Sequence, residues 1–121
     1  MSRLFASALL VLSVALPIGV ARAHAMLERA EPAVGAVVAV SPAALVLHFS
    51  ETLEPAFAQV GVADAGGGSV TAGPPSPAPE DGRVLRVPLK PLPPGDYTVT
   101  WSVVSTDTHR TQGRFTFRVE H

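Results

Sequence analysis

The 121-residue chain contains no cysteine. This absence excludes a disulfide-stapled scaffold, a cysteine-ligated zinc finger, a thioredoxin-like redox site and a cysteine nucleophile. Aromatic residues are also scarce, with five Phe, one Trp and one Tyr, so the chain has no stacking platform for nucleobases. Nine Lys and Arg against ten Asp and Glu leave no basic stripe that would neutralise phosphates. We therefore expect no nucleic-acid binding, and the length indicates one small domain.

The first 23 residues hold a large share of the apolar side chains and have the features of a secretory signal peptide. Arg3 provides a positively charged start, residues 4–21 carry no charge, and Ala21-Arg22-Ala23 has the A-x-A form that signal peptidase cleaves. A run of about 18 apolar residues is also the lower limit for a membrane-spanning helix. A proline and a glycine just before the A-x-A motif interrupt such a helix, so we favour cleavage after Ala23 over an uncleaved anchor.

Cleavage would separate residues 1–23 from an exported domain of residues 24–121. The mature domain would keep 98 of the 121 residues, and its seven basic residues would stand against ten acidic ones, for a net charge of −3. A domain of this size buries roughly two-thirds of the surface that its unfolded chain exposes. That is enough for one hydrophobic core without disulfides.

Apolar and polar residues alternate along the mature chain, and no uninterrupted stretch of eleven residues has helical periodicity. The alternation predicts an all-β domain with about seven short strands. The five clearest are residues 45–50, 59–64, 84–89, 97–104 and 114–119, and the two weaker ones are residues 26–31 and 36–40. Residues 73–82, with four prolines, are expected to form a surface loop or hairpin crossing. Short strands separated by turns are typical of a two-sheet sandwich or a Greek-key barrel of immunoglobulin-like type.

Alternation also predicts which side chains point into the core. The inward positions are Tyr97, Val99, Trp101 and Val103 on one strand and Phe115, Phe117 and Val119 on another. His48 is on the opposite face of its strand from Leu47 and Phe49, so we expect it at the surface. His121 ends the chain and is assigned no role.

Two histidines and one aspartate form the grouping that most resembles a site. His24 would become the first residue of the mature chain, with a free α-amine beside its imidazole. The amine and Nδ1 can bind one ion in a six-membered chelate ring. Asp107 and His109 are two residues apart, so on an extended segment their side chains project to the same side and converge on one ion.

These donors favour one oxidation state of copper. Three nitrogens and one oxygen suit the tetragonal preference of Cu(II), whereas Cu(I) prefers thiolates and thioethers. The methionines are Met1, which leaves with the signal, and Met26. Taken singly each motif is weak, because an aspartate two residues before a histidine is usually a surface hydrogen-bonded pair.

Six segments, in order along the chain, resemble the CopC family of periplasmic copper-binding proteins. They are residues 24–27 (HAML), 31–36 (EPAVGA), 47–51 (LHFSE), 92–101 (LPPGDYTVTW), 104–109 (VSTDTH) and 113–117 (GRFTF). The resemblance covers nearly all of the mature chain. It implies a Greek-key, immunoglobulin-like β-barrel, cupredoxin-like in appearance, that binds Cu(II) through an N-terminal histidine brace in copper resistance or import.

The resemblance also implies roles for individual residues. By position, His24 supplies its amine and Nδ1, His109 a further imidazole nitrogen and Asp107 a carboxylate oxygen. Glu51, at the end of the FSE motif, matches a position that lies at the Cu(II) site in some members, and we treat it as a weak or indirect ligand. Family members commonly accompany, or are fused to, a CopD-type inner-membrane protein, so a copper transporter of that type is the expected partner of a monomeric protein.

One departure from the family narrows the expected function. Some members carry a methionine-rich loop that forms a separate Cu(I) site, but residues 65–82 here contain no methionine. We therefore expect a Cu(II) carrier that sequesters or delivers copper and is not an enzyme. Two alternatives stay open: a copper-dependent oxidative enzyme with a histidine brace, as in lytic polysaccharide monooxygenases, and a metal-free immunoglobulin-like interaction module.

Overall fold

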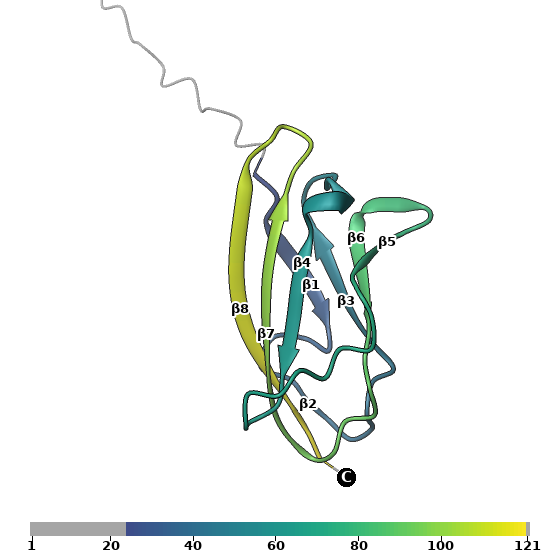
Figure 1. The fold of residues 1–121 in the computed structure, drawn as a ribbon, viewed down its shortest axis with the longest axis vertical. Coiled ribbons are helices and arrows are strands. Elements are labelled where there is room, and N and C mark those ends of the chain that lie inside the picture. Colours follow the sequence, from purple (N-terminus) through teal and green to yellow (C-terminus); the bar gives the residue numbers. More distant parts are fainter. Residues whose placement is uncertain (1–23, 121) are drawn as a thin grey trace, which may run out of the picture.

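The computed structural model describes residues 24–120, so the predicted signal peptide and His121 lie outside the described part of the chain. Strands β1 to β8 form two four-stranded sheets that pack face to face (Figure 1). The first sheet has the order β1 (Leu27–Glu31), β3 (Ala44–Phe49), β6 (Asp81–Pro88), β5 (Ser76–Ala78). The second has the order β2 (Val37–Val38), β8 (Arg110–Val119), β7 (Gly95–Val104), β4 (Gln59–Ala63).

The strand order identifies the class of sandwich. Neighbouring strands are antiparallel, except that β2 runs parallel to β8. With β2 set aside as an added edge, the two sheets correspond to the ABED and CFG sheets of the immunoglobulin fold. The predicted all-β, immunoglobulin-like class is thus confirmed. The short 3-10 helix η1 (Pro55–Phe57) joins β3 to β4, and no helix in residues 24–120 has the length and apolar character needed to cross a membrane.

Tyr97, near the start of β7, supplies a further feature of this fold. Its hydroxyl donates a hydrogen bond to the backbone carbonyl of Pro93 at 2.5 Å, as in the tyrosine corner of immunoglobulin-like domains. Burial of the ring, and secondarily the charge of Asp64, raises the pKa of Tyr97 above its ordinary value. The hydroxyl therefore stays protonated and fixes the turn that leads into β7.

The core lies between the inner faces of the two sheets. It is formed mainly by Leu45, Leu47, Phe49, Leu85 and Val87 from the first sheet and by Val62, Tyr97, Val99, Val103, Phe115, Phe117 and Val119 from the second. The alternation of buried and exposed residues along β8 is the predicted one, with Phe115, Phe117 and Val119 inward. Burial of each such side chain contributes roughly 1.5–3 kcal/mol to folding.

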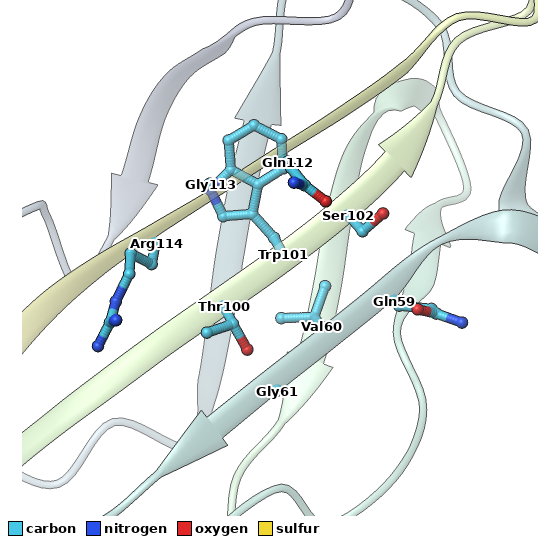
Figure 2. Close-up of a pocket in the computed structure, with 9 residues that line it drawn as sticks. All are labelled: Gln59, Val60, Gly61, Thr100, Trp101, Ser102, Gln112, Gly113 and Arg114. Atoms are coloured by element: carbon cyan, nitrogen blue, oxygen red, sulfur yellow. The ribbon is translucent and has the colours of Figure 1, made fainter.

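Trp101 is only partly buried, although the sequence pattern places it in the core. Its ring packs edge-on against Phe49, with ring centroids 5.2 Å apart, and lies beside Gly113, its register partner on β8 (Figure 2). A Cβ atom at Gly113 would come within 2.6 Å of the indole. The close approach of this ring to β8 therefore requires glycine at position 113.

The predicted strands are all present, with shifted boundaries, and the structure adds one more. Strand β5 lies inside the proline-rich segment that the sequence predicts to be a loop or crossing. Proline has no N–H for a strand ladder and is tolerated mainly on edge strands. Strand β5 is the edge of its sheet, paired with β6 alone, which explains why it accommodates Pro77.

Candidate metal centre

The β7–β8 hairpin carries Asp107 and His109 in its turn. The backbone N–H of Ser105 donates to the carbonyl of His109 at 3.0 Å, and that of Thr108 donates to the carbonyl of Ser105 at 2.8 Å. The bond between Ser105 and His109 closes a loop of three residues, of which Thr108 is the last. Its φ of 73° lies in the left-handed region, which is common at this position of three-residue hairpin loops. The expectation of an extended segment here is therefore wrong. The two side chains still meet, because the turn folds Asp107 back onto His109.

Asp107 is held by three hydrogen-bond donors. Its Oδ2 lies 3.0 Å from Nδ1 of His109, and its Oδ1 accepts from the His109 backbone N–H at 3.3 Å and from the hydroxyl of Ser105. The hydrogen bond from Ser105, followed by that from the His109 ring, lowers the pKa of Asp107 to about 2. Asp107 is therefore a carboxylate at neutral pH.

This pairing determines which nitrogen of His109 is available to a ligand. A carboxylate beside Nδ1 favours the tautomer in which Nδ1 carries the proton and Nε2 has a free lone pair. The His109 side chain is 59% exposed, so solvent and ions reach it. Metal-binding histidines in proteins commonly donate their second ring N–H to a carboxylate in this way.

His24 approaches the same hairpin from the start of the described chain. In Figure 1 the purple N-terminal segment lies beside the β7–β8 hairpin, at the end of the sandwich opposite the C-terminus. The His24 and His109 rings meet edge to face, with centroids 4.5 Å apart and an interplanar angle of 76°. Nδ1 of His24 is buried without a hydrogen-bond partner among the described residues. A buried, unsatisfied nitrogen is rare in folded proteins and is consistent with a place for an ion.

Glu51 lies in the loop that follows β3, next to Ser50. Its carboxylate makes no hydrogen bond or ion pair with His24, Asp107 or His109. Within residues 24–120, no group of three or more His, Asp or Glu side chains is arranged to hold a metal ion. A site at His24 and His109 therefore depends on a donor that is not a side chain, which the α-amine of a cleaved N-terminus would provide.

His48 lies on the outer face of the first sheet, as its strand pattern predicts. Its Nε2 is 3.2 Å from the Arg29 guanidinium and 3.6 Å from the carboxylate of Glu31. Arginine only donates hydrogen bonds, so Nε2 of His48 acts as an acceptor there. His48 is thus occupied by its neighbours and is not directed at the candidate centre.

A hollow of about 690 Å³ lies on the second sheet and contains none of the candidate ligands (Figure 2). Its lining consists of Gln59, Val60, Gly61, Thr100, Trp101, Ser102, Gln112, Gly113 and Arg114. A metal ion needs a few convergent donor atoms and no large cavity. The geometry of the donors, and not the hollow, therefore locates the candidate centre at the end of the β7–β8 hairpin.

Comparison with known proteins agrees with the fold and with the motifs. Residues 27–120 match the model of the CopC domain. The chain belongs to the CopC family. It is 39% identical over 99 residues to Protein YobA of Escherichia coli strain K12, which covers 81% of this chain and 80% of that protein. It is 32% identical over 107 residues to Copper resistance protein C of Escherichia coli, covering 83% of this chain and 84% of that one.

Solved structures of CopC proteins have the same fold as this chain. CopC from Methylosinus trichosporium OB3b superposes with a TM-score of 0.75 at 30% identity, covering 80% of this chain and 94% of that chain. PcoC, a methionine-rich copper resistance protein from Escherichia coli, superposes with a TM-score of 0.71 at 30% identity, covering 80% and 99%. The resemblance inferred from the motifs is thus confirmed. Unlike methionine-rich PcoC, this CopC-family chain has two methionines in all.

Three hydroxyl residues at this end of the molecule had no role in the sequence-based hypothesis. They are Ser50, Ser105 and Thr111, and each donates a hydrogen bond to a candidate ligand or to the backbone beside one. Ser50 and Ser105 lie inside segments that resemble the CopC family, and this was the one indication in the sequence that they could matter to the site. Their partners are set by tertiary contacts, which local patterns do not report.

Proposed function

We propose that the mature chain, starting at His24, is a periplasmic protein that binds Cu(II) and sequesters or delivers it. The observation that carries this proposal is the buried, unpartnered Nδ1 of His24 beside the ring of His109. An unsatisfied buried nitrogen costs roughly 1–3 kcal/mol, and an ion bound at that nitrogen would remove the cost. The names of the relatives, Copper resistance protein C, support copper as the ion.

The proposed donors are three nitrogens and one carboxylate oxygen. His24 provides its α-amine and Nδ1 as a chelating pair, and His109 provides Nε2. Asp107 accepts from Nδ1 of His109, on the far side of the ring from Nε2, so its carboxylate oxygen could reach the ion only after that hydrogen bond opens. Cu(II) prefers such tetragonal nitrogen and oxygen sets and binds them more tightly than the other divalent first-row ions do. Glu51 stays a candidate for a weak contact only.

Soft ligands for Cu(I) are scarce around this centre. The sequence has no cysteine, and Met26, the one methionine in residues 24–120, is 63% exposed. Residues 65–82 contain no methionine, in contrast to methionine-rich PcoC. We therefore propose that the protein carries Cu(II) without a separate Cu(I) site.

Export would create the amine on which this chelate depends. In the precursor the nitrogen of His24 belongs to a peptide bond with Ala23, and an amide nitrogen is a poor ligand at neutral pH. Cleavage after Ala23 would convert it to a primary amine. We propose that the protein becomes competent for copper only after export, acts as a monomer, and exchanges copper with a CopD-type inner-membrane transporter.

We propose a carrier and not an oxidative enzyme. The large apolar side chains that residues 24–120 expose are Met26, Val34, Val37, Val40 and Phe57. They include a single aromatic ring, whereas an enzyme that acts on polysaccharide surfaces would use a flat group of several. Ascorbate-driven oxidation of chitin or cellulose by the copper-loaded protein, absent without copper, would favour the enzyme instead.

The decisive experiment compares the mature protein with a variant that carries one extra alanine before His24. The insertion keeps every side chain but moves the amine away from the imidazole, which breaks the chelate. Competition with a chelator of known affinity should show Cu(II) binding weakened by more than the roughly 10–100-fold that loss of a supporting contact causes. Equal affinities would rule out the brace.

Two further measurements test the same proposal. N-terminal sequencing of the exported protein should begin at His24, and a different start would favour the metal-free module. Cu(II) affinity should fall steadily as the pH is lowered from about 8 to about 4, because protons compete for the amine and the imidazoles. Copper uptake that is constant over this range would contradict the ligand set.

A further inference from the structure

Two hydroxyl groups hold the backbone of the first three described residues. The Ser50 hydroxyl accepts a hydrogen bond from the N–H of Met26 at 2.9 Å and donates one to the carbonyl of His24 at 3.3 Å. The Thr111 hydroxyl donates to the carbonyl of Ala25 at 2.7 Å. Consecutive peptide groups are thus each fixed by a side chain from elsewhere in the fold.

The two hydroxyls reach this segment from different sheets. Ser50 directly follows β3 of the first sheet, and its own N–H also donates to the carbonyl of Met26 at 2.9 Å. Thr111 belongs to β8 of the second sheet. Ala25, between them, is 0% exposed, so its methyl group is inserted into the sandwich. Chain termini usually fray, whereas this segment, the start of the proposed mature chain, is anchored on both sides.

We propose that Ser50 and Thr111 are positioning residues, which clamp residues 24–26 so that His24 is held ready to chelate Cu(II). The inference rests on the proposed function and concerns how the fold prepares that site. Thr111 is the second residue of β8, and His109 is the last residue of the turn before this strand. The bond from Thr111 to Ala25 therefore sets the position of one histidine relative to the other. The clamp therefore favours the arrangement in which the two ring centroids lie 4.5 Å apart.

Preorganisation is the physical advantage of such a clamp. A loose terminus would have to be ordered when copper binds, and the lost backbone and side-chain freedom would weaken binding. The amine and the imidazole are both attached to the Cα of His24. Once the carbonyl of His24 is fixed, only rotations about the bonds of this one residue are left to bring the two donors into place. Supporting contacts of this kind typically change metal affinity by roughly 10–100-fold when removed.

Matched substitutions isolate the hydroxyl at position 111. In the mature protein, Thr111→Val keeps the shape but removes the donor, whereas Thr111→Ser keeps the donor. Thr116→Val, at an exposed position on the same strand, is the control for a threonine-to-valine change. Chelator competition should show Cu(II) binding weakened about 10-fold or more in Thr111→Val. Thr111→Ser and Thr116→Val should bind like the wild type.

Ser50→Ala tests the other half of the clamp and has a readout that needs no copper. In the metal-free protein, hydrogen exchange at the Met26 amide should be slow in the wild type and at least about 10-fold faster in Ser50→Ala, because the amide loses its acceptor. Cu(II) binding should weaken by about 10-fold or more in the same variant. Ser76→Ala, at an exposed position on β5, is the control.

The outcomes separate the clamp from the proposed function. Faster exchange at Met26 with unchanged Cu(II) affinity would overturn the positioning role and leave the brace intact. Wild-type affinity in a folded Ser50→Ala/Thr111→Val protein would overturn it in the same way. If the mature wild-type protein fails to bind Cu(II), the proposed function is wrong, and the positioning role in copper binding falls with it. Should the double variant not fold, the single variants decide.

Discussion

The imidazole rings of His24 and His109 lie edge to face, with their centroids 4.5 Å apart. His24 precedes the first strand, and His109 is the last residue of the turn before the last strand. The contact therefore joins two segments that lie near opposite ends of the domain's sequence. Close to this contact, the Thr111 hydroxyl of β8 donates a hydrogen bond to the carbonyl of Ala25 at 2.7 Å. The contact places nitrogen atoms of two imidazole rings at the same end of the sandwich, the buried Nδ1 of His24 and those of the exposed His109 ring.

His109→Ala should weaken Cu(II) binding far more than His48→Ala, a change at a histidine outside the candidate centre. The substitution removes the exposed ring that lies against His24, and we expect a loss above the ~100-fold upper range for supporting contacts. His48→Ala is the matched control, because His48 sits on the outer face of the other sheet between Arg29 and Glu31. Chelator competition measures both. Similar losses in the two variants would contradict the assignment.

The stability that Asp107 contributes should disappear in acid. The hydroxyl of Ser105, followed by the His109 ring, lowers the pKa of Asp107 from 3.8 to about 2. A carboxyl whose pKa is lower in the folded state stabilises it above the unfolded pKa, and this contribution is lost as the pH falls through the folded pKa. In the metal-free protein, the Tm difference between wild type and Asp107→Asn should therefore be full above about pH 4 and shrink toward pH 2. Thermal unfolding followed by circular dichroism at several pH values measures it, and a constant difference would refute the prediction.

Thr108→Gly should stabilise the metal-free protein. Thr108 is a β-branched residue with a φ of 73°, and the left-handed region costs such a residue about 1–2 kcal/mol. Glycine enters that region freely, although it gains more freedom in the unfolded chain, so the net gain should be up to about 1 kcal/mol. Thr106→Gly, in the same turn but without a positive φ, should instead lose roughly 0.5–1 kcal/mol. Chemical denaturation compares them, and equal losses at both positions would be evidence against strain at Thr108.

Gly113→Ala should destabilise the fold through Trp101. The new Cβ would lie 2.6 Å from Cζ2 and 2.8 Å from Cε2 of the indole, so the ring must move away from β8. Overpacking of this kind costs about 1–3 kcal/mol. Gly66→Ala is the control, because its nearest atom lies at an ordinary 3.5 Å. Denaturation measures the loss, and the fluorescence of the single tryptophan should shift in Gly113→Ala alone.

Local alternation was sufficient for most of the sheet structure but not for every strand or turn. It identified the inward residues of β8 because a strand presents its side chains to two faces in strict alternation. It missed β5 because prolines interrupt that segment, and it placed Asp107 on an extended segment where the chain turns. Whether a segment is an edge strand or a hairpin turn depends on which strands lie beside it, and alternation does not contain that information.

By itself the sequence determined the chemical character of the candidate site. A histidine after a cleavage motif, an aspartate two residues before another histidine, and the absence of cysteine are properties of residue type and order. Only the tertiary structure decided that His24 meets His109, that Ser105 holds Asp107, and that the hydroxyls of Ser50 and Thr111 anchor residues 24–26. Most of these contacts join segments far apart along the chain. They exist because two sheets pack face to face and bring the start of β1, the end of β3 and the start of β8 to the same end of the sandwich.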